Sequence, residues 1–231
     1  LDYIAGGCQI SMQVAIDFTK SNKDPRNPLS LHFSTQTRPS AYERAIRQVG
    51  DILSDFDRSG SHPVYGFGAQ VKGPAGRLEP TSHCFHTNFN PATPFVNGGV
   101  DGVVQCYRNA IPQVALSGPT YFRHIIKNAA AVARSTNQAQ IQKYNVLVLL
   151  TDGIIHDFQE TIHEIVEASY LPLSIIIIGI GNADFTKMDQ LCADEEPLVS
   201  NVTGKVMMQD IVKFVAFRDY NSRQPWKLAR D

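Results

Sequence analysis

The hexapeptide Asp17-Phe18-Thr19-Lys20-Ser21-Asn22 carries one carboxylate and two hydroxyls at alternate positions, directly after the apolar run Ile10 to Ile16. An apolar run of this length predicts a strand, so the polar side chains are expected on the turn that ends it. Oxygens at positions i, i+2 and i+4 of a tight turn can point at one centre, and Mg²⁺ takes oxygen ligands in near-octahedral geometry. The turn therefore indicates a site for a hard cation, although Asp, Ser and Thr also form ordinary turns and helix caps.

Two further loops carry suitable oxygens. The apolar run Tyr144 to Leu150 ends in Thr151-Asp152-Gly153, and Ser117-Gly118-Pro119-Thr120 precedes an Ala-rich helical stretch. In open parallel sheets, ligands bind outside the carboxyl ends of the strands, at the point where strand order reverses. We therefore expect the three loops to converge on one site.

Apolar runs of strand length alternate with amphipathic segments of helix length, which is typical of βαβ units around a parallel sheet. The runs at 146–150 and 175–178 are apolar without alternation, as expected for strands that helices cover on both faces. The sequence thus predicts an α/β fold with a doubly wound, mostly parallel, Rossmann-type central sheet flanked by helices on both faces. The predicted strands are 10–17, 62–67, 84–87 within a loop at 73–94, 144–150, 173–180 and an edge strand at 205–208. The predicted helices are 40–53, 98–110, 120–137, 157–168, 185–191 and one that starts near Asp210.

Composition indicates one globular domain over residues 1–231. The 231 residues are 43% hydrophobic, enough for a substantial core. Lys and Arg (21) nearly balance Asp and Glu (22), so no overall field favours nucleic acid or an anionic bilayer as a partner. No apolar run reaches the roughly 18 residues that span a membrane. The four cysteines are far apart and predict free thiols in a reducing compartment: Cys8, Cys84, Cys106 and Cys192.

Other motifs favour other chemistries only weakly. Gly179-Ile180-Gly181 follows a strand, but Asp184 replaces the third glycine of a dinucleotide loop and would repel a pyrophosphate. His83-Cys84-Phe85-His86 lacks a second ligand pair at zinc spacing. His156 lies near the expected site, yet hard cations prefer oxygen to nitrogen. The G-x-S-x-G elbow of serine hydrolases is absent from the sequence.

Seven segments together resemble the von Willebrand factor A-type domain of the copine family, in order and over nearly the whole chain. They are 1–7, Val14 to Thr19 with Ser21 and Asn22, 65–69, 88–91, 118–120, 150–153 and 183–185. The resemblance implies a von Willebrand factor A-like fold and a metal-ion-dependent adhesion site (MIDAS). By position, its ligands map to Asp17, Thr19, Ser21, Thr120 and Asp152, with Mg²⁺ or Mn²⁺ as the cofactor.

The resemblance also implies a setting for the domain. The chain begins with Leu1, so we expect a domain excised from a longer cytoplasmic protein, in which upstream C2 domains bind phospholipid in a calcium-dependent manner. Membrane association would then be peripheral and would depend on C2 domains absent from this chain. In A-type domains ligand binding can accompany movement of the last helix, here the segment from Asp210 onward.

We therefore expect a metal-dependent protein-binding module that is not an enzyme, with partner proteins that present an Asp or Glu side chain to the cation. Two alternatives stay open at this point. One is the substrate-recognition domain of a ubiquitin ligase, and the other is a metal-dependent phosphotransferase or hydrolase, which would need a positioned base and a Lys or Arg clamp. The sequence leaves the oligomeric state undecided.

Overall fold

The computed structural model describes residues 9–57, 59–137, 143–193 and 196–219. In this part of the chain, a central sheet of seven strands has the spatial order β10 (Val212–Ala216), β9 (Leu173–Gly179), β8 (Lys143–Thr151), β1 (Gln9–Asp17), β2 (Ser61–Phe67) and β5 (Phe85–His86), and β6 (Phe95–Asn97) also pairs with β2. The strands from β10 to β2 run parallel, whereas β5 and β6 are antiparallel to β2. Strand order reverses between β1 and β8, which are neighbours at the middle of the sheet.

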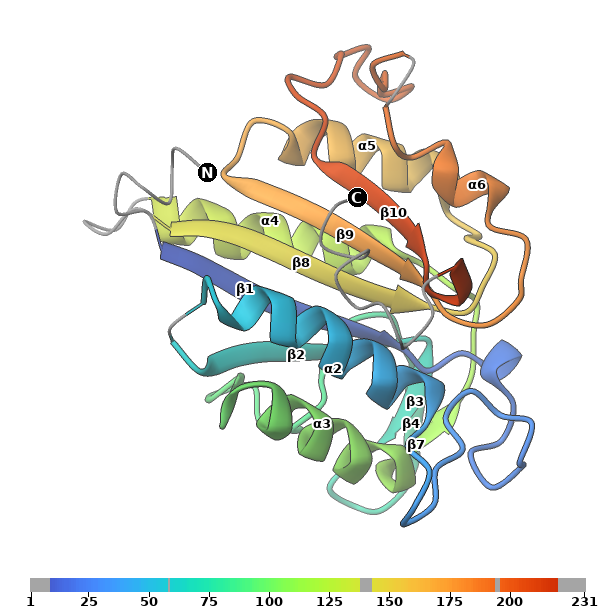
Figure 1. Cartoon of the computed structure of the whole chain (residues 1–231). Helices are drawn as coiled ribbons and strands as arrows, with labels where there is room; N and C mark the ends of the chain where they lie inside the picture. The colour runs from blue at the N-terminus through green and yellow to red at the C-terminus, as the bar shows by residue number, and fades with distance from the viewer. Residues whose placement is uncertain (1–8, 58, 138–142, 194–195, 220–231) are drawn as a thin grey trace.

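Helices cover both faces of this sheet (Figure 1). On one face lie α2 (Ala41–Ser54) and α3 (Gly99–Ala110), and on the other lie α4 (Arg123–Asn137) and α5 (Phe158–Ala168). Burial alternates accordingly along β8, because Val148 packs in the cluster with α2 and α3 while Leu147 and Leu149 pack in the cluster with α4 and α5. The doubly wound α/β fold is therefore confirmed. Each large side chain buried there contributes roughly 1.5–3 kcal/mol.

Local signals explain most helix boundaries. Ser40 caps α2, where Glu43 N–H donates to Ser40 Oγ at 3.1 Å. Helix α4 begins at Arg123, three residues later than predicted from 120, because the amides of Phe122 and Arg123 donate to the Asp157 carboxylate, both at 3.0 Å. The predicted short helix at 185–191 is present as α6 (Thr186–Asp189).

The helix predicted to start near Asp210 is wrong. Residues Val212–Ala216 form β10, which pairs parallel with β9 in the register Val212↔Ile175. Val212 and Val215 are buried, and a run of β-branched and aromatic side chains suits the open edge that β9 offers. A 3-10 turn, η3 (Phe217–Asp219), follows, so the segment assigned to a mobile last helix is a strand as far as it is described.

A second, small sheet was not predicted, and one of its strands, Leu78–Ser82, lies within the loop predicted at 73–94. Strands β3 (Ala69–Lys72), β4 (Leu78–Ser82) and β7 (Val114–Leu116) form a second, antiparallel sheet in the order β4-β3-β7. Each strand is short, which left no periodic signal to read in the sequence. The predicted edge strand at 205–208 is reduced to an isolated bridge, Val199↔Val206.

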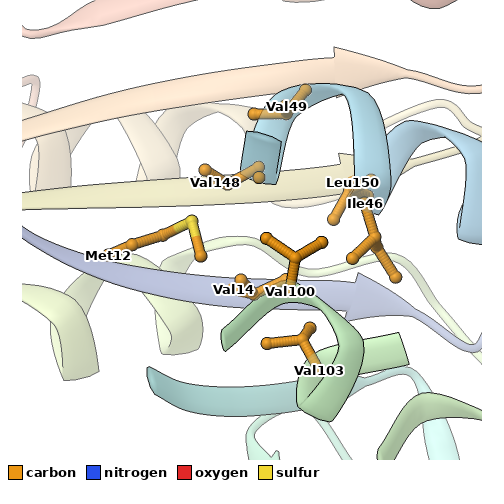
Figure 2. Close-up of a pocket in the computed structure, with 9 residues that line it drawn as sticks. Met12, Val14, Ile46, Val49, Val100, Val103, Val148 and Leu150 are labelled. Carbon is orange, nitrogen blue, oxygen red and sulfur yellow. The ribbon is translucent and has the colours of Figure 1, made fainter. Parts of the chain in front are cut away.

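The core between the central sheet and helices α2 and α3 is mainly apolar and also contains the buried rings of His32, Tyr42 and Tyr107. A cavity of about 10 Å³ lies there, and Gly50 is among its lining residues. Figure 2 shows the lining side chains that come from β1, β8, α2 and α3: Met12, Val14, Ile46, Val49, Val100, Val103, Val148 and Leu150. Its lining offers no polar side chain to a ligand. None of the described helices combines the length and apolar character needed to span a bilayer. Cys84 and Cys106 carry free thiols, as predicted, and Cys8 lies outside the described residues.

Candidate metal centre

Two strand ends and a third loop meet where the strand order of the central sheet reverses. Strands β1 and β8 are parallel neighbours in the register Ile16↔Leu150, which sets Asp17 beside Thr151. A 3-10 turn, η1 (Lys20–Asn22), follows β1, and Lys20 N–H donates to Ser117 O at 2.7 Å. The predicted convergence of the three loops at the carboxyl ends of the strands is therefore observed.

Four of the five predicted ligands form one continuous chain of contacts. Asp17 Oδ1 accepts hydrogen bonds from the Thr19 amide at 2.8 Å and from Thr19 Oγ1 at 2.6 Å. Thr19 Oγ1 lies 2.8 Å from Ser21 Oγ, and Ser21 Oγ donates to Asp152 Oδ1 at 2.8 Å. Ser21 and Asp152 are 131 residues apart in sequence, so the fold brings oxygen atoms from two distant segments into one small cluster.

The hydrogens available to this chain do not suffice for its contacts. The single hydroxyl hydrogen of Thr19 is used on Asp17, and that of Ser21 is used on Asp152. One of the three oxygen–oxygen contacts, the one between the two hydroxyl oxygens, therefore has no hydrogen while both carboxylates are ionised. A proton on a carboxylate or a cation beside the oxygens would make the arrangement favourable.

The raised pKa values of the two carboxyl groups also indicate that a cation would be favourable beside them. Burial raises the pKa of Asp17, although hydrogen bonds from Thr19 and Thr151 oppose the shift. Burial, and then the negative charge of Asp17, raise the pKa of Asp152 to about 7. Among the described residues, no Lys or Arg forms an ion pair with either group. Two buried carboxylates without a cationic partner, beside two hydroxyls, form a set of hard oxygen donors that fits Mg²⁺ or Mn²⁺.

Thr120 stands apart from this network. Its amide donates to His156 Nδ1 at 3.3 Å, and the His156 amide donates back to Thr120 O at 3.0 Å. The Thr120 loop is therefore held against the loop that follows β8. In the described part of the chain, however, no hydrogen bond joins the Thr120 hydroxyl to the other four residues. His156, considered above as a possible ligand, instead holds the Thr120 loop in place.

Two positioning residues escaped the sequence analysis. Thr151 is fully buried and its Oγ1 donates to Asp17 Oδ2 at 2.7 Å. Asn22 is also fully buried: its amide group donates to Thr19 O at 3.2 Å, and its Oδ1 accepts from Tyr42 OH at 2.8 Å. The register of β1 against β8 would have shown Thr151, whereas Asn22 resembles any turn residue in sequence.

The competing motifs of the sequence have ordinary structural roles. Asp184 accepts hydrogen bonds from the amide and the hydroxyl of Thr186, at 3.0 and 2.6 Å, at the start of α6. His83 stacks against Tyr121 and His124, with ring centroids 4.6 and 5.6 Å away. Across the described residues, no group of three or more His, Cys, Asp or Glu side chains could hold a metal ion. A cation site in this part of the chain therefore depends on hydroxyl oxygens.

Solved structures share this fold. Proximal thread matrix protein 1 from the mussel byssus matches with a TM-score of 0.50 at 14% identity over 96% of this chain and 46% of the mussel chain, and one of its structures has a zinc-occupied MIDAS motif. Manganese-loaded TRAP protein of Plasmodium vivax matches with a TM-score of 0.51 at 10% identity, over 91% of this chain and 70% of that chain. This chain thus spans less than half the length of the mussel protein. At such identities the likeness shows the von Willebrand factor A-type fold alone.

The family itself is shown by sequence. The family model described as Copine matches residues 30–231, which includes Thr120 and Asp152 and leaves Asp17, Thr19 and Ser21 just before its start. The match extends over most of the chain and agrees with the resemblance in the sequence motifs. The chain therefore belongs to the copine family.

Proposed function

We propose that this domain is a metal-ion-dependent protein-binding module. In this proposal Asp17, Thr19, Ser21, Thr120 and Asp152 hold Mg²⁺ or Mn²⁺, and the cation binds an Asp or Glu side chain of a partner protein. The observation that carries the proposal is the continuous oxygen network from Asp17 to Asp152, in which two hydroxyl hydrogens serve three oxygen–oxygen contacts.

The proposed roles follow from the environment of each side chain. Asp17 supplies the principal negative charge and is fixed by Thr19 and Thr151. Ser21 is exposed at the surface, so the oxygen cluster is open to a partner on that side. The bound cation would supply positive charge and an exchangeable coordination position, which a carboxylate fills well.

Proteins of the same fold give independent support for a divalent cation. The mussel protein has been solved with zinc in its MIDAS motif, and TRAP protein has been solved loaded with manganese. Metal-dependent phosphoryl chemistry, by contrast, would need cationic groups around a phosphate as well as the cation. Lys20 is exposed, and Asp17 and Asp152 have no Lys or Arg partner among the described residues. A binding role fits these side chains better than catalysis does.

Water-proton relaxation tests this proposal, because Mn²⁺ bound to the chain relaxes the water that it exchanges. A peptide with a single Glu among Gly and Ser residues should displace that water and lower the relaxation, whereas the same peptide with Gln should not. The Asp17→Asn variant should bind no Mn²⁺ under the same conditions, and Asp184→Asn should behave like the unaltered chain. Equal responses to the Glu and Gln peptides would contradict the proposal. Metal-dependent hydrolysis of p-nitrophenyl phosphate that is lost in Asp17→Asn would favour an enzyme instead.

The proposal extends to the longer protein expected from the sequence. There, upstream C2 domains would bring the module to phospholipid when calcium rises, and the module would recruit its partner from the cytoplasm. Vesicle sedimentation of the longer protein with and without Ca²⁺ checks this arrangement. Sedimentation that is independent of calcium, or that the present chain reproduces alone, would contradict it.

A further inference from the structure

An open groove of about 560 Å³ lies beside the proposed metal centre. One of its sides is the loop that follows Thr19, and the other is the segment that contains β7. Its lining residues are Lys20, Lys23, Asp24, Pro25, Arg26, Ile111, Pro112, Val114, Ala115 and Leu116. The groove and the metal centre thus share one loop.

The two features are joined covalently and by hydrogen bonds. Lys20 lies between Thr19 and Ser21 in sequence, and its amide donates to Ser117 O at 2.7 Å, one residue beyond the end of β7. Thr19 and Ser117 also form an isolated parallel bridge. A chain bound in the groove would therefore reach the metal centre at one end.

The loop side of the groove carries uncompensated positive charge. Arg26 is paired with Asp24 at 2.7 Å, and both are exposed. Lys20 and Lys23 are also exposed, and neither forms an ion pair within the described residues. Two free ammonium groups beside a cation site favour a ligand with several negative charges, whereas the chain as a whole is nearly neutral.

The opposite side is apolar and includes a strand edge. Ile111, Val114 and Leu116 are half-buried, so their side chains offer contact area to a ligand. Strand β7 is the last strand of its sheet, in the order β4-β3-β7. Edge strands can pair with an added extended segment, and side chains at alternate positions of that segment then face the same side.

The loop is held in place before any ligand binds. Ser30 Oγ lies 2.8 Å from Asn22 O and 3.0 Å from Lys23 O, and its hydroxyl hydrogen can be donated to either carbonyl. Lys23 has a φ of 66°, a left-handed conformation that is uncommon for residues other than glycine. A preorganised wall lowers the entropic cost of binding.

We propose that this groove binds an extended acidic segment of the partner protein. One carboxylate of the segment binds the cation, further acidic side chains pair with Lys20 and Lys23, and the alternate apolar side chains pack on Val114 and Leu116. The inference rests on the proposed function, since the metal-bound carboxylate fixes one end of the segment. An anionic lipid surface is the less favoured occupant, because it would make no use of the apolar side or of the strand edge.

The test uses the 231-residue chain, Mn²⁺ and a short fluorescent peptide of alternating Glu and Val residues. Fluorescence anisotropy should show binding that weakens about five- to tenfold in the Lys20→Ala/Lys23→Ala variant, the effect expected of two exposed ion pairs. The matched variant Lys213→Ala, at an exposed position of β10, should leave the affinity unchanged. Amide resonances of 114–117 should shift in NMR spectra when the peptide is added. Added salt should weaken binding more for the unaltered chain than for the double variant.

Each arm has an outcome that overturns the inference. Equal peptide affinity in the double variant, no peptide binding while Mn²⁺ is bound, or amide shifts that avoid 114–117 would each do so. Binding of phosphatidylserine vesicles through the two lysines, without peptide binding, would reassign the groove to a lipid surface. Mn²⁺ binding to each variant is measured in parallel. If the unaltered chain bound no Mn²⁺, the proposed function would fail rather than the groove assignment alone.

Discussion

The tetrapeptide Asp-Phe-Thr-Lys occurs twice in this chain, at 17–20 and at 184–187, and its Asp and Thr form the same hydrogen bonds in both copies. In both copies the Asp Oδ1 accepts from the Thr amide and hydroxyl two residues later, at 2.8 and 2.6 Å in the first and at 3.0 and 2.6 Å in the second. Phe18 and Phe185 are both buried. The same Asp–Thr hydrogen bonds thus form at the end of β1, where Thr19 is extended, and at the start of α6, where Thr186 is helical.

The two copies differ in what the rest of the fold places around them. Asp17 is fully buried beside Thr151 and the Asp152 carboxylate, and burial raises its pKa. Asp184 is exposed, and hydrogen bonds from Thr186 lower its pKa. The fourth residue after the Asp is Ser21 in the first copy and the buried Met188 in the second. The Asp–Thr hydrogen bonding is therefore a local property of the tetrapeptide, whereas a cation site requires the second strand end and the second hydroxyl.

The largest expected effect separates the two copies directly. Asp17→Asn keeps the size of the side chain but removes a ligand charge, and should weaken Mn²⁺ binding at least about 100-fold, or about 3 kcal/mol. Asp184→Asn should change the affinity less than about twofold, because an exposed turn residue lacks the other ligands. Isothermal titration calorimetry measures both. Similar losses in the two variants would mean that the tetrapeptide alone binds the cation.

A second effect concerns the glycine that contacts Thr19. Gly68 has a φ of 75°, and a Cβ there would lie 2.3 Å from Thr19 Cγ2, so Gly68→Ala should destabilise the fold by about 2–3 kcal/mol and displace Thr19. Gly76 has a φ of 72° with no atom within 4 Å of an added Cβ, so Gly76→Ala reports the cost of the backbone conformation alone, about 1 kcal/mol. Urea unfolding and Mn²⁺ titration of the two variants separate the cost of the backbone conformation from the cost of the contact with Thr19. Equal effects on metal affinity would contradict close packing at Thr19.

A third prediction concerns Asp57, a buried carboxylate that lies near the end of β1 opposite to Asp17. Its Oδ2 accepts from the Met12 amide at 2.8 Å and lies 3.3 Å from His62 Nδ1. Burial alone would raise the pKa of Asp57, but the close contact with His62 and the hydrogen bonds from Met12 and Ser59 outweigh burial and hold the pKa well below its usual range. The two buried carboxylates thus differ in the balance of these effects, because burial outweighs the hydrogen bonds from Thr19 and Thr151 at Asp17 but is outweighed at Asp57.

Because the pKa of Asp57 is lower in the folded state than in the unfolded chain, the stability that it contributes is present above about pH 4 and is lost as the pH falls below that value. Asp57→Asn should lower the unfolding free energy by about 2 kcal/mol at pH 7, with a difference that shrinks toward pH 3. Urea unfolding of both proteins at several pH values checks this. A difference that stays constant with pH would contradict the role of the charged form.

The variant with the smallest expected effect should change stability and leave metal binding unchanged. The cavity of about 10 Å³ in Figure 2 adjoins Val148, and Val148→Ile should fill part of it and stabilise the fold by up to about 1 kcal/mol. Gly50→Ala is the contrasting change, because its Cβ would lie 2.7 Å from Val100 Cγ2 and should overpack the same region. Thermal unfolding and Mn²⁺ titration are the measurements. A change of metal affinity in Val148→Ile would show that core and site are coupled.

The sequence predicted those elements and site residues whose sequence pattern was local or strongly periodic. The apolar runs that became β1, β8 and β9 predicted a doubly covered parallel sheet, and the acidic ends of β1 and β8 predicted where Asp17 and Asp152 would meet. β10 was mistaken for a helix because its five residues gain strand character only from pairing with β9. Thr151 could not be assigned without the register of β1 against β8. The tetrapeptide alone does not distinguish Asp17 from Asp184, whereas Ser21 at the fourth position after Asp17, in place of Met188, does.

Anomalous diffraction from crystals of the chain soaked in Mn²⁺ tests the central claim most directly. We expect one Mn²⁺ peak in contact with Asp17, Ser21 and Asp152, and none at Asp184, where the same tetrapeptide lacks the second carboxylate. A peak at Asp184, or a Mn²⁺ ion held only by residues outside the Asp17 network, would contradict the account.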